Sequence, residues 1–536
     1  IKELSKIGAG GIVCYSAGFK EAGNNGNQLE RDLAEAVGDM ALIGPNCYGF
    51  INYLDDIALW PFAHGGFSAG YGAAIITQSG MFSSDITMSQ RSLPMTFMIS
   101  AGNQAVMGLE DFVDFLSEHP ETRAIGIHIE GFSDIPKFEA AALKALETGT
   151  AIVALKTGTS DIGRSLTVSH TGSLSGSNTF YEALFERCGV ISVNNPSQFL
   201  ETLKYLCVVK PPKGNRIAGF TCSGGGATML ADHGQKIALN FPTFEDVEAE
   251  KLGQLLPDIA TVSNPLDYTT PIWGQPEKTL KVFEAAIEAK NFDATVLVQD
   301  YPAKGLDESK VYYLNDADAF GRAARKFGIP AAICATLPEN LDQETREHLI
   351  SQGVAPMQGI HECLNAIQQV ANWEQQRSNI IKSPLSPISP GAIGDQDFSY
   401  LSEADGKSLL SKSDISIPSG KVVNEAASIA AAQALGFPLV IKMVNANLPH
   451  KTEAGAVKLG IANIPDLENA ILEIRKSVSA YDREAFTDIF LIEKMAAPPL
   501  AEMIIGLRQD KQFGWTLTIG SGGILVEVLE DTKTLL

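Results

Sequence analysis

The stretch AIITQSGMFSSDITMS, residues 74–89, begins with small and β-branched apolar residues and passes through Ser79 and Gly80 into a helical pattern. A second stretch, IAGFTCSGGGATMLADHG at 217–234, has the same order of parts. We expect a strand, a tight turn and a helix in each. Similar apolar runs, each followed by a Gly or Ser turn, recur along the chain. This alternation predicts an α/β protein whose parallel sheets are covered by helices on both faces.

Both turns are rich in glycine and serine. Glycine lets backbone N–H groups approach an anion closely, and the start of a helix carries a partial positive charge. Such turns also occur for packing alone, so a single one is weak support for a binding site. Because two consecutive α/β units carry one, we expect one anion held between two helix starts. The candidate residues are Ser79, Gly80, Ser223, Gly224, Gly225 and Gly226.

Size and composition indicate an acidic, multidomain protein. The chain has 536 residues, of which 45% are hydrophobic, and this length exceeds that of a usual single domain. Its net charge is −22, and no basic cluster is present, so nucleic acid is not an expected partner. Seven scattered cysteines without a CxxC pair favour a reducing, cytoplasmic location. No apolar stretch approaches the ~20 residues that span a bilayer, so no membrane partner is expected.

The stretch SLTVSHTGSLSG, residues 165–176, places His170 among hydroxyl residues and glycines. This composition is typical of a turn or a helix start and not of a packed core. Taken alone, His170 is interpreted as an exposed loop histidine.

Several motifs together resemble those of the NDP-forming acyl-CoA synthetase superfamily, the relatives of succinyl-CoA synthetase and of the ADP-forming acetyl-CoA synthetases. They follow the family's domain order along almost the whole chain. In that order they are GPNCYGFIN (44–52), SAGNQAVMGLEDFVDFL (100–116), IHIEGFSD (127–134), SHTGSLSGS (169–177), CSGGGATMLAD (222–232), SNPLDYTTP (263–271), GFPLVIK (436–442), LPHKTEAGAV (448–457) and GSGGILVEVLED (520–531).

The resemblance implies a multidomain α/β fold. It consists of the carboxyl part of a Rossmann-like CoA-binding domain, two flavodoxin-like ligase domains, a proline-rich linker and an ATP-grasp domain. The expected ranges are 1–65, 66–208, 209–377, 378–398 and 399–536. The chain starts with IKELSKIGAGG, which is typical of the inside of an α/β domain. We therefore expect residues upstream, and an ATP-grasp domain that continues further.

The resemblance also implies the central chemistry. His170 would be the phosphohistidine, because an imidazole nitrogen can take a phosphoryl group from ATP and pass it to a carboxylate. Glu130 would accept the other ring N–H and fix the tautomer; its alternative is a carboxylate that caps a turn. His450 would carry the phosphoryl group between the ATP site and His170; its alternative is a structural loop histidine.

Further roles follow from the same resemblance. The ligands would be ATP, CoA, Mg²⁺ and a small carboxylic acid, and the assembly a homodimer. Mg²⁺ prefers oxygen ligands. The implied residues are Lys442 and Glu493 for ATP, Asn46 and Cys47 for CoA, and Glu527 and Asp531 for Mg²⁺.

The identity of the acid is less defined. Tyr268 and Trp273 lie close to a motif expected near the active site, and aromatic rings can hold a cationic acid, cover an apolar one, or simply pack. A cationic acid such as dimethylsulfoniopropionate would suit a branch of the superfamily that couples ligation to loss of dimethyl sulfide. Asp300, at a strand end, is a speculative base for that elimination.

Three functions therefore remain open. The first is an ATP-dependent, ADP-forming acyl-CoA synthetase. The second is the ligase-lyase acting on dimethylsulfoniopropionate. The third is a non-catalytic CoA-binding regulator, although a regulator needs no pair of relay histidines.

Overall fold

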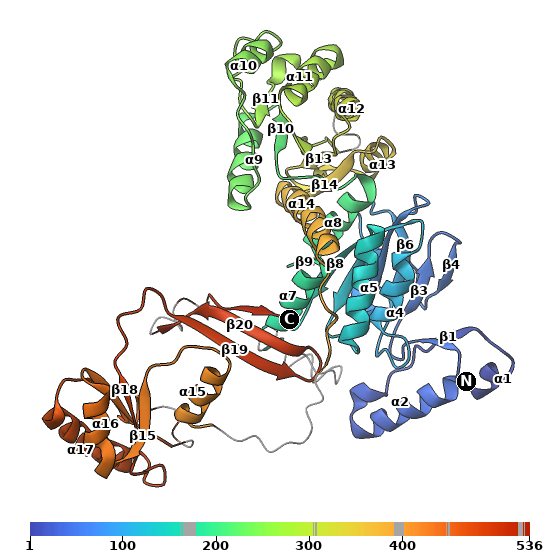
Figure 1. Ribbon diagram of the computed structural model, residues 1–536. Coiled ribbons are helices and arrows are strands. Elements are labelled where there is room, and N and C mark those ends of the chain that lie inside the picture. The colour runs from blue at the N-terminus through green and yellow to red at the C-terminus, as the bar shows by residue number, and fades with distance from the viewer. Residues whose placement is uncertain are drawn as a thin grey trace. The chain divides into compact units, whose positions relative to one another are not determined.

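A computed structural model describes the chain except for residues 161, 164–177, 304, 306–307, 391–400, 446–447, 449–450, 524–528 and 530. The chain divides into two compact units (Figure 1). Unit 1 contains residues 1–391, 507–518 and 533–536, and unit 2 contains residues 392–506 and 519–532.

Unit 1 begins with a small parallel β-α-β segment. The elements are α1 (Lys2–Lys6), β1 (Gly11–Val13), α2 (Asn24–Val37) and β2 (Ala41–Ile43), and the two strands pair in parallel. Leu33 and Val37 of α2 pack on Met40 and Leu42 in a core of their own. A parallel pair with its crossover helix agrees with part of a Rossmann-like domain.

A seven-stranded sheet follows, in the order β4-β3-β6-β5-β7-β8-β9. Strands β5 to β9 run parallel, and β3 and β4 add an antiparallel edge. The strands are β3 (Gly49–Asn52), β4 (Ile57–Leu59), β5 (Gly72–Thr77), β6 (Met95–Ser100), β7 (Thr122–Ile129), β8 (Ala151–Lys156) and β9 (Ile191–Val193). Its helices are α3 (Gly80–Thr87), α4 (Leu109–Ser117), α5 (Ile135–Thr148), α7 (Asn178–Cys188) and α8 (Pro196–Val208).

Both faces of this sheet are covered (Figure 1). Ile75 belongs to the core that contains Phe199 and Leu203 of α8. Its neighbour Ile76 belongs to a second core, together with Phe112 of α4. Successive residues of a strand point to opposite faces, so the apolar runs without a polar alternation are explained by burial on both sides.

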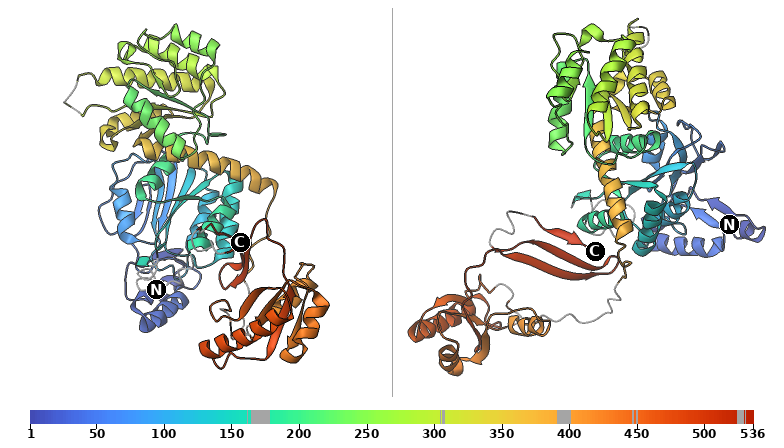
Figure 2. Two further views of the ribbon diagram at one scale, coloured as in Figure 1. Left: turned by 90° about the vertical axis from the view of Figure 1, so that its left-hand side faces the viewer. Right: turned by 45° about the horizontal axis from the view of Figure 1, so that its top comes forward.

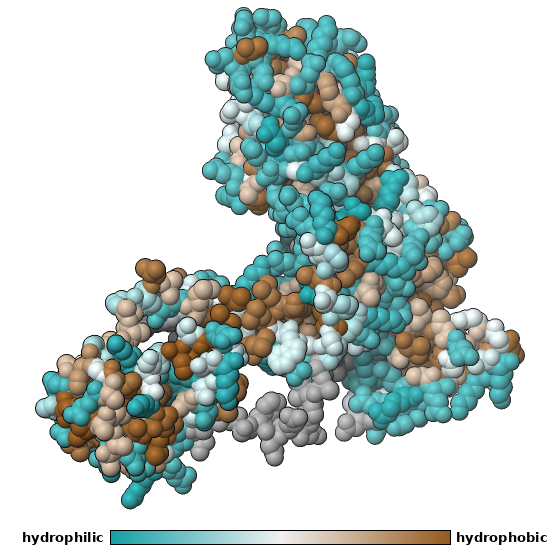
Figure 3. Space-filling model, viewed as in Figure 1, coloured by the Kyte–Doolittle hydropathy of each residue, from teal (hydrophilic) through white to brown (hydrophobic). Residues whose placement is uncertain are grey.

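The second sheet of unit 1 has five parallel strands in the order β11-β10-β12-β13-β14. The strands are β10 (Ile217–Thr221), β11 (Leu266–Asp267), β12 (Ala294–Val298), β13 (Ala331–Ala335) and β14 (Ala355–Gln358). The helices are α9 (Gly224–Lys236), α10 (Asp246–Gly253), α11 (Pro276–Ala289), α12 (Lys310–Phe327), α13 (Gln343–Ser351) and α14 (Ile360–Lys382). Figure 2 shows helices on both sides of this sheet, and Figure 3 shows that their visible outer surface is mostly hydrophilic.

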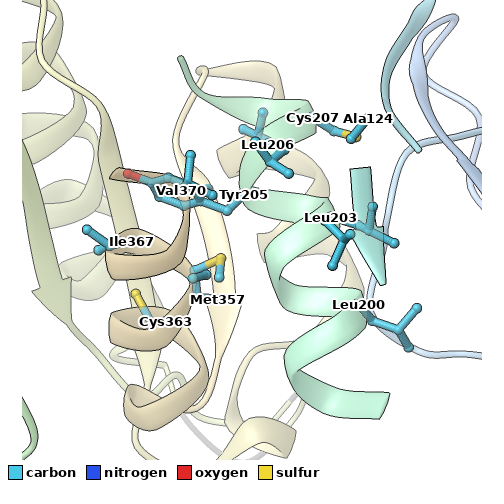
Figure 4. Packing of buried hydrophobic residues seen from close by; sticks show 14 of the residues in the cluster. Ala124, Leu200, Leu203, Tyr205, Leu206, Cys207, Met357, Cys363, Ile367 and Val370 are labelled. Atoms are coloured by element: carbon cyan, nitrogen blue, oxygen red, sulfur yellow. The ribbon is translucent and has the colours of Figure 1, made fainter. Parts of the chain in front are cut away.

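The seven-stranded and five-stranded sheets of unit 1 share one hydrophobic core through α8 and α14 (Figure 4). Leu203 of α8 lies toward Ala124 of β7, whereas Tyr205 of the same helix lies beside Val370 of α14. All four side chains are buried. Because α8 follows the first sheet and α14 the second, this packing fixes the two sheets to each other.

Unit 2 contains a four-stranded antiparallel sheet in the order β15-β18-β16-β17. The strands are β15 (Gly420–Asn424), β16 (Leu439–Met443), β17 (Val457–Ile461) and β18 (Ile489–Lys494), and the helices are α15 (Glu403–Lys412), α16 (Ser428–Leu435) and α17 (Ile464–Tyr481). Ile441, Ile474 and Phe490 are fully buried in its core. A further sheet, β19 (Met503–Asp510), β20 (Gly514–Ser521) and β21 (Lys533–Leu535), has residues in both units.

One boundary differs from the ranges expected from the sequence: helix α14 continues to Lys382, inside the range 378–398 expected as linker. Residues 507–518, which belong to the range expected as the ATP-grasp domain, pack as part of unit 1. The reason is Phe513, which is 1% exposed and packs its ring at 5.3 Å from that of Tyr181 on α7.

Candidate active site

The first glycine turn joins β5 to α3 at the carboxyl end of the seven-stranded sheet. Ser79 is the N-cap of α3, and its Oγ accepts a hydrogen bond from Phe82 N at 3.3 Å. A Cβ placed on Gly80 would lie 3.0 Å from the ring of Tyr48. The absence of a side chain at Gly80 thus lets Tyr48, in the GPNCYGF motif, reach the helix start.

The second turn joins β10 to α9 at the carboxyl end of the five-stranded sheet. Ser223, Gly224 and Gly225 are exposed, and Ser223 caps α9 without a side-chain hydrogen bond. Gly226 is buried, and a Cβ placed there would lie 2.6 Å from Thr221 Oγ1. The first residues of α9 therefore present N–H groups to solvent, as an anion site requires.

Each of the two turns contains the same kind of hydrogen bond, which the sequence analysis did not predict. Ser79 N donates to Thr77 Oγ1 at 3.0 Å, and Ser223 N donates to Thr221 Oγ1 at 3.2 Å. In each case the hydroxyl of the last strand residue accepts a hydrogen bond from the backbone of the N-cap serine. The signal was available as the repeated pattern T-x-S-G, found as TQSG and TCSG.

Glu130 follows β7, the strand next to β5. Its Oε2 is buried and has no hydrogen-bond partner among the residues that the structure describes. A buried carboxylate oxygen without a hydrogen-bond donor lowers the stability of the fold. Oε2 is therefore suited to accept a hydrogen bond from a further group. His170, the predicted donor, lies in 164–177 and thus outside the described residues.

The predicted CoA residues lie in a turn after β2. Asn46 has a φ of 57° and donates from Nδ2 to Asn103 Oδ1 at 3.3 Å. Cys47 donates from Sγ to Cys14 O at 3.3 Å, and burial raises the pKa of its thiol to about 11. Both side chains thus make hydrogen bonds within the protein. Their assignment to CoA stays a prediction.

In unit 2, Lys442 and Glu493 lie on the paired strands β16 and β18, with Lys442 Nζ 3.1 Å from Glu493 Oε2. Lys442 Nζ also lies 2.5 Å from Glu403 Oε1. Lys407 contacts both carboxylates, at 2.6 Å from Glu493 and 2.9 Å from Glu403, and Lys451 lies 3.4 Å from Glu403. We call these five residues the lysine cluster; it has three positive and two negative charges.

The lysine cluster lies beside a cavity of about 610 Å³, lined by Glu403, Lys442 and Lys451 among others. Burial favours a raised pKa at Glu403, but hydrogen bonds from Lys407 and Lys442 outweigh it and lower the pKa to about 2. Burial opposes the charge of Lys442, but Glu403 and Glu493 outweigh it and raise its pKa. Glu403 and Lys442 are thus both ionised near neutral pH.

Sequence reasoning found Lys442 and Glu493 but missed Glu403, Lys407 and Lys451. The spacing of four between Glu403 and Lys407 on α15 is a weak signal for an ion pair on a helix. It gives no indication that this pair meets β16. Glu493 is only 4% exposed, and its carboxylate faces the lysines. His450 lies outside the described residues.

The predicted magnesium ligands are Glu527 and Asp531. Among them, no three His, Cys, Asp or Glu side chains are placed to hold a metal ion. Asp531 accepts from Ser521 N at 3.0 Å and from Ser521 Oγ at 2.6 Å, and these bonds lower its pKa. The other predicted ligand, Glu527, lies outside the described residues. We therefore assign no step to Mg²⁺.

The three predicted acid-site residues have internal partners. Tyr268 is fully buried, and its hydroxyl donates to Asp316 Oδ2 at 3.0 Å. Trp273 packs its ring at 4.8 Å from that of Tyr313. Asp300 accepts hydrogen bonds from the backbone N–H groups of residues 336 and 337, both at 3.0 Å. The alternative of packing, left open for the aromatic pair, is what the structure displays for Tyr268.

Two family models match the chain. One, described as the succinyl-CoA ligase like flavodoxin domain, matches residues 71–206, and the other, an ATP-grasp domain, matches residues 392–536. An acetate-CoA ligase (ADP-forming) I from Archaeoglobus fulgidus is 29% identical over 99% of this chain and 76% of its own length. The chain belongs to the NDP-forming acyl-CoA synthetase superfamily. The resemblance found in the sequence motifs is thereby confirmed.

Other members of the superfamily are similar over comparable lengths. A trans-feruloyl-CoA synthase from an unknown prokaryotic organism is 29% identical over 99% of this chain and 76% of the relative. A solved structure of a dinucleotide forming acetyl-coenzyme A synthetase 1 from Ca. Korarchaeum cryptofilum has a TM-score of 0.61 and 22% identity, covering 72% of this chain and 81% of that chain. At this identity the structure supports the fold alone, which agrees with the expected flavodoxin-like and ATP-grasp architecture.

No helix in the described parts of the chain is both long and apolar enough to cross a membrane.

Proposed function

We propose that this superfamily member is an ATP-dependent, ADP-forming acyl-CoA synthetase that works through a phosphohistidine at His170. The observation that carries the proposal is Glu130 Oε2, which is buried and has no hydrogen-bond partner among the described residues. Glu130 follows β7, the strand next to β5, which leads into the Ser79–Gly80 turn. A carboxylate in that position can accept a hydrogen bond from an imidazole N–H and keep the opposite ring nitrogen free to attack phosphorus.

The chemistry divides into four transfers. A nitrogen of His450 attacks the γ-phosphorus of ATP, so that an N–P bond forms, the β,γ P–O bond breaks and ADP leaves. The His170 nitrogen then attacks this phosphorus, so that a new N–P bond forms and the bond to His450 breaks. An oxygen of the acid then attacks the same phosphorus, which breaks the N–P bond and gives an acyl phosphate. Finally the thiol of CoA, losing its proton, attacks the acyl carbon and phosphate leaves. The Ser79–Gly80 and Ser223–Gly226 turns would hold the phosphoryl group through backbone N–H groups.

Unit 2 would supply the nucleotide site. The lysine cluster lies at a cavity, and Lys442 is its member on the central strand β16. Ammonium groups bind phosphates as point charges. His450 precedes Lys451 of the cluster, and we propose that His450 takes the γ-phosphoryl group there and delivers it to His170.

The substrate is proposed only as a carboxylic acid. The names of two similar relatives, an acetate-CoA ligase and a trans-feruloyl-CoA synthase, give one small and one aromatic acid. A coupled lyase step is not favoured by any contact found at Asp300 or Tyr268, since both are engaged within the protein. The homodimer and the cytoplasmic location stay predictions.

The proposal is tested by labelling with ATP that carries a radioactive γ-phosphate. We expect acid-labile label on the wild type, label confined to His450 in His170→Ala, and strongly slowed labelling of His170 in His450→Ala. A chase with CoA and a panel of acids, from acetate to ferulate and dimethylsulfoniopropionate, should discharge the wild-type label with one of them and release the acyl-CoA. Discharge of label by an acid in His170→Ala, or a wild type that takes no label, would overturn the proposal.

A further inference from the structure

We propose that Gln78 is a positioning residue that ties the first anion-binding turn to the backbone of Glu130. Gln78 lies between Thr77 and Ser79 in the turn after β5. Its Oε1 accepts from the backbone N–H groups of Glu130 and, at 3.2 Å, of Gly131. Its Nε2 donates to Gly131 O at 2.8 Å. One amide thus makes three hydrogen bonds to the segment that carries the Glu130 carboxylate.

This clamp needs an uncharged group that donates and accepts at once. A carboxylate at position 78 would offer no hydrogen to Gly131 O, and an ammonium would offer no lone pair to the two N–H groups. Glutamine meets both needs and has the length to span from one turn to the other. The residue type therefore matches the contacts, which a side chain serving only to fill space would not require.

A second set of hydrogen bonds, between His128, Thr77 and Ser79, also holds this turn. His128 of β7 is 6% exposed, and its Nδ1 lies 2.9 Å from Thr77 Oγ1. That hydroxyl donates to Ser79 O at 3.2 Å and accepts from Ser79 N at 3.0 Å. The hydroxyl has a single hydrogen, so His128 Nδ1 donates to Thr77 Oγ1 where that hydrogen serves Ser79 O, and accepts from it otherwise. Burial lowers the pKa of His128 to about 4, and Lys156 adds to this effect, so the imidazole stays neutral.

The hydrogen bonds of Gln78 and those of His128 with Thr77 connect the Ser79–Gly80 turn to the segment that carries Glu130. Thr77 and His128 are paired residues of the neighbouring strands β5 and β7. A backbone hydrogen bond from Gln78 N to His128 O, at 3.2 Å, extends the strand pairing to the start of the first turn, and the side chain of Gln78 continues the link to Gly131. With the clamp, the Ser79–Gly80 helix start and the Glu130 carboxylate keep a fixed separation, so that a phosphoryl group and the imidazole that carries it meet both. This inference rests on the proposed function, since it gives Glu130 its role toward His170.

The test measures the rate of His170 labelling in the full chain after mixing with γ-labelled ATP. Gln78→Met keeps the length of the side chain but loses all three hydrogen bonds. We expect its labelling rate to fall on the order of 100-fold, with an unchanged KM for ATP, because the nucleotide is bound by other residues. The matched control is Gln343→Met, whose amide makes one exposed hydrogen bond, to Glu347 at 2.8 Å; it should label like the wild type.

A conservative variant separates positioning from folding. In Gln78→Glu a protonated carboxyl regains the donor to Gly131 O, so its labelling rate relative to wild type should rise as the pH is lowered from about 8 to about 5. Gln78→Met should gain nothing over that range. Likewise His128→Asn, which keeps an N–H near the position of Nδ1, should retain more activity than His128→Leu.

The outcomes are distinguishable. Labelling of the wild type together with near-normal rates in Gln78→Met overturns this inference and leaves the proposed function intact. A slow Gln78→Glu that does not respond to pH, in a variant with the thermal stability of the wild type, overturns it as well. A wild type that takes no label overturns the proposed function and this inference together.

Discussion

Glu130 has one buried carboxylate oxygen, Oε2, that is available to accept a hydrogen bond from a catalytic imidazole. Its Oε2 lacks a described partner, whereas its backbone N–H is bound by Gln78. We expect Glu130→Gln to keep the size of the side chain but to lose the charge that stabilises a phosphorylated, positively charged imidazole. The steady rate of acyl-CoA formation should fall roughly 10²- to 10⁴-fold, as for the loss of a positioned acid or base. A rate within a factor of two of the wild type would leave Glu130 as a capping carboxylate.

Lys442 allows a similar test in unit 2. Hydrogen bonds to charged groups contribute about 1.5–3 kcal/mol, so Lys442→Met should raise the KM for ATP roughly 10- to 100-fold. The control is Lys458→Met, which removes an ammonium from the neighbouring strand β17, where it pairs with exposed Glu473 at 2.5 Å. Steady-state kinetics should show an unchanged KM for that variant. Equal effects of the two changes would mean that general charge, and not the lysine cluster, binds the nucleotide.

At the scale of elements, the turn between β19 and β20 packs into the hydrophobic core of unit 1. Phe513 in this turn is 1% exposed, and its ring lies 5.4 Å from that of Phe180 and 5.3 Å from that of Tyr181. Phe513→Ala should therefore lower the free energy of unfolding of unit 1 by about 3–5 kcal/mol, the usual cost of a deleted buried aromatic side chain.

Urea denaturation checks this prediction, with Trp515→Ala as the control two residues further along. Trp515 is 58% exposed, so its removal should change stability by less than about 0.5 kcal/mol. A Phe513→Ala protein as stable as this control would show that the turn is not needed for the core of unit 1.

At the scale of the whole molecule, the two units should differ in their sensitivity to acid. In unit 1 the pKa of His128 is lowered from 6.5 to about 4, so the unfolded chain takes up the proton first. Stability from this group is complete above about pH 6.5 and is lost as the pH falls toward 4. In unit 2 the pKa of Glu403 is lowered from 4.5 to about 2, so its contribution is lost only below about pH 4.5.

Tryptophan fluorescence can follow unit 1 separately, because all four tryptophans, Trp60, Trp273, Trp373 and Trp515, belong to it. We expect the urea midpoint to fall between about pH 7 and 4, and His128→Asn to remove on the order of 2–3 kcal/mol of that dependence. The wild type and the variant differ only at position 128, so the difference between their two curves isolates His128. Parallel curves would contradict the buried, neutral state of its imidazole.

The sequence by itself determined the α/β class, the superfamily and the position of both glycine turns. Local patterns suffice there, because apolar runs of strand length followed by T-x-S-G fix a strand, an N-cap and a helix start without reference to distant residues. β5 ends at Thr77 and α3 starts at Gly80, and β10 and α9 repeat this order at Thr221 and Gly224.

Only the tertiary structure decided which side chains meet across the fold. Gln78 binds the backbone at Glu130 because β7 lies beside β5, an order of strands that no local pattern contains. Lys407 joins Lys442 because α15 lies against β16 and β18. Tyr268 can be fully buried because its hydroxyl donates a hydrogen bond to Asp316 of α12. Such contacts depend on sheet order and helix placement, which are set by the packing of the whole unit and not by neighbours in sequence.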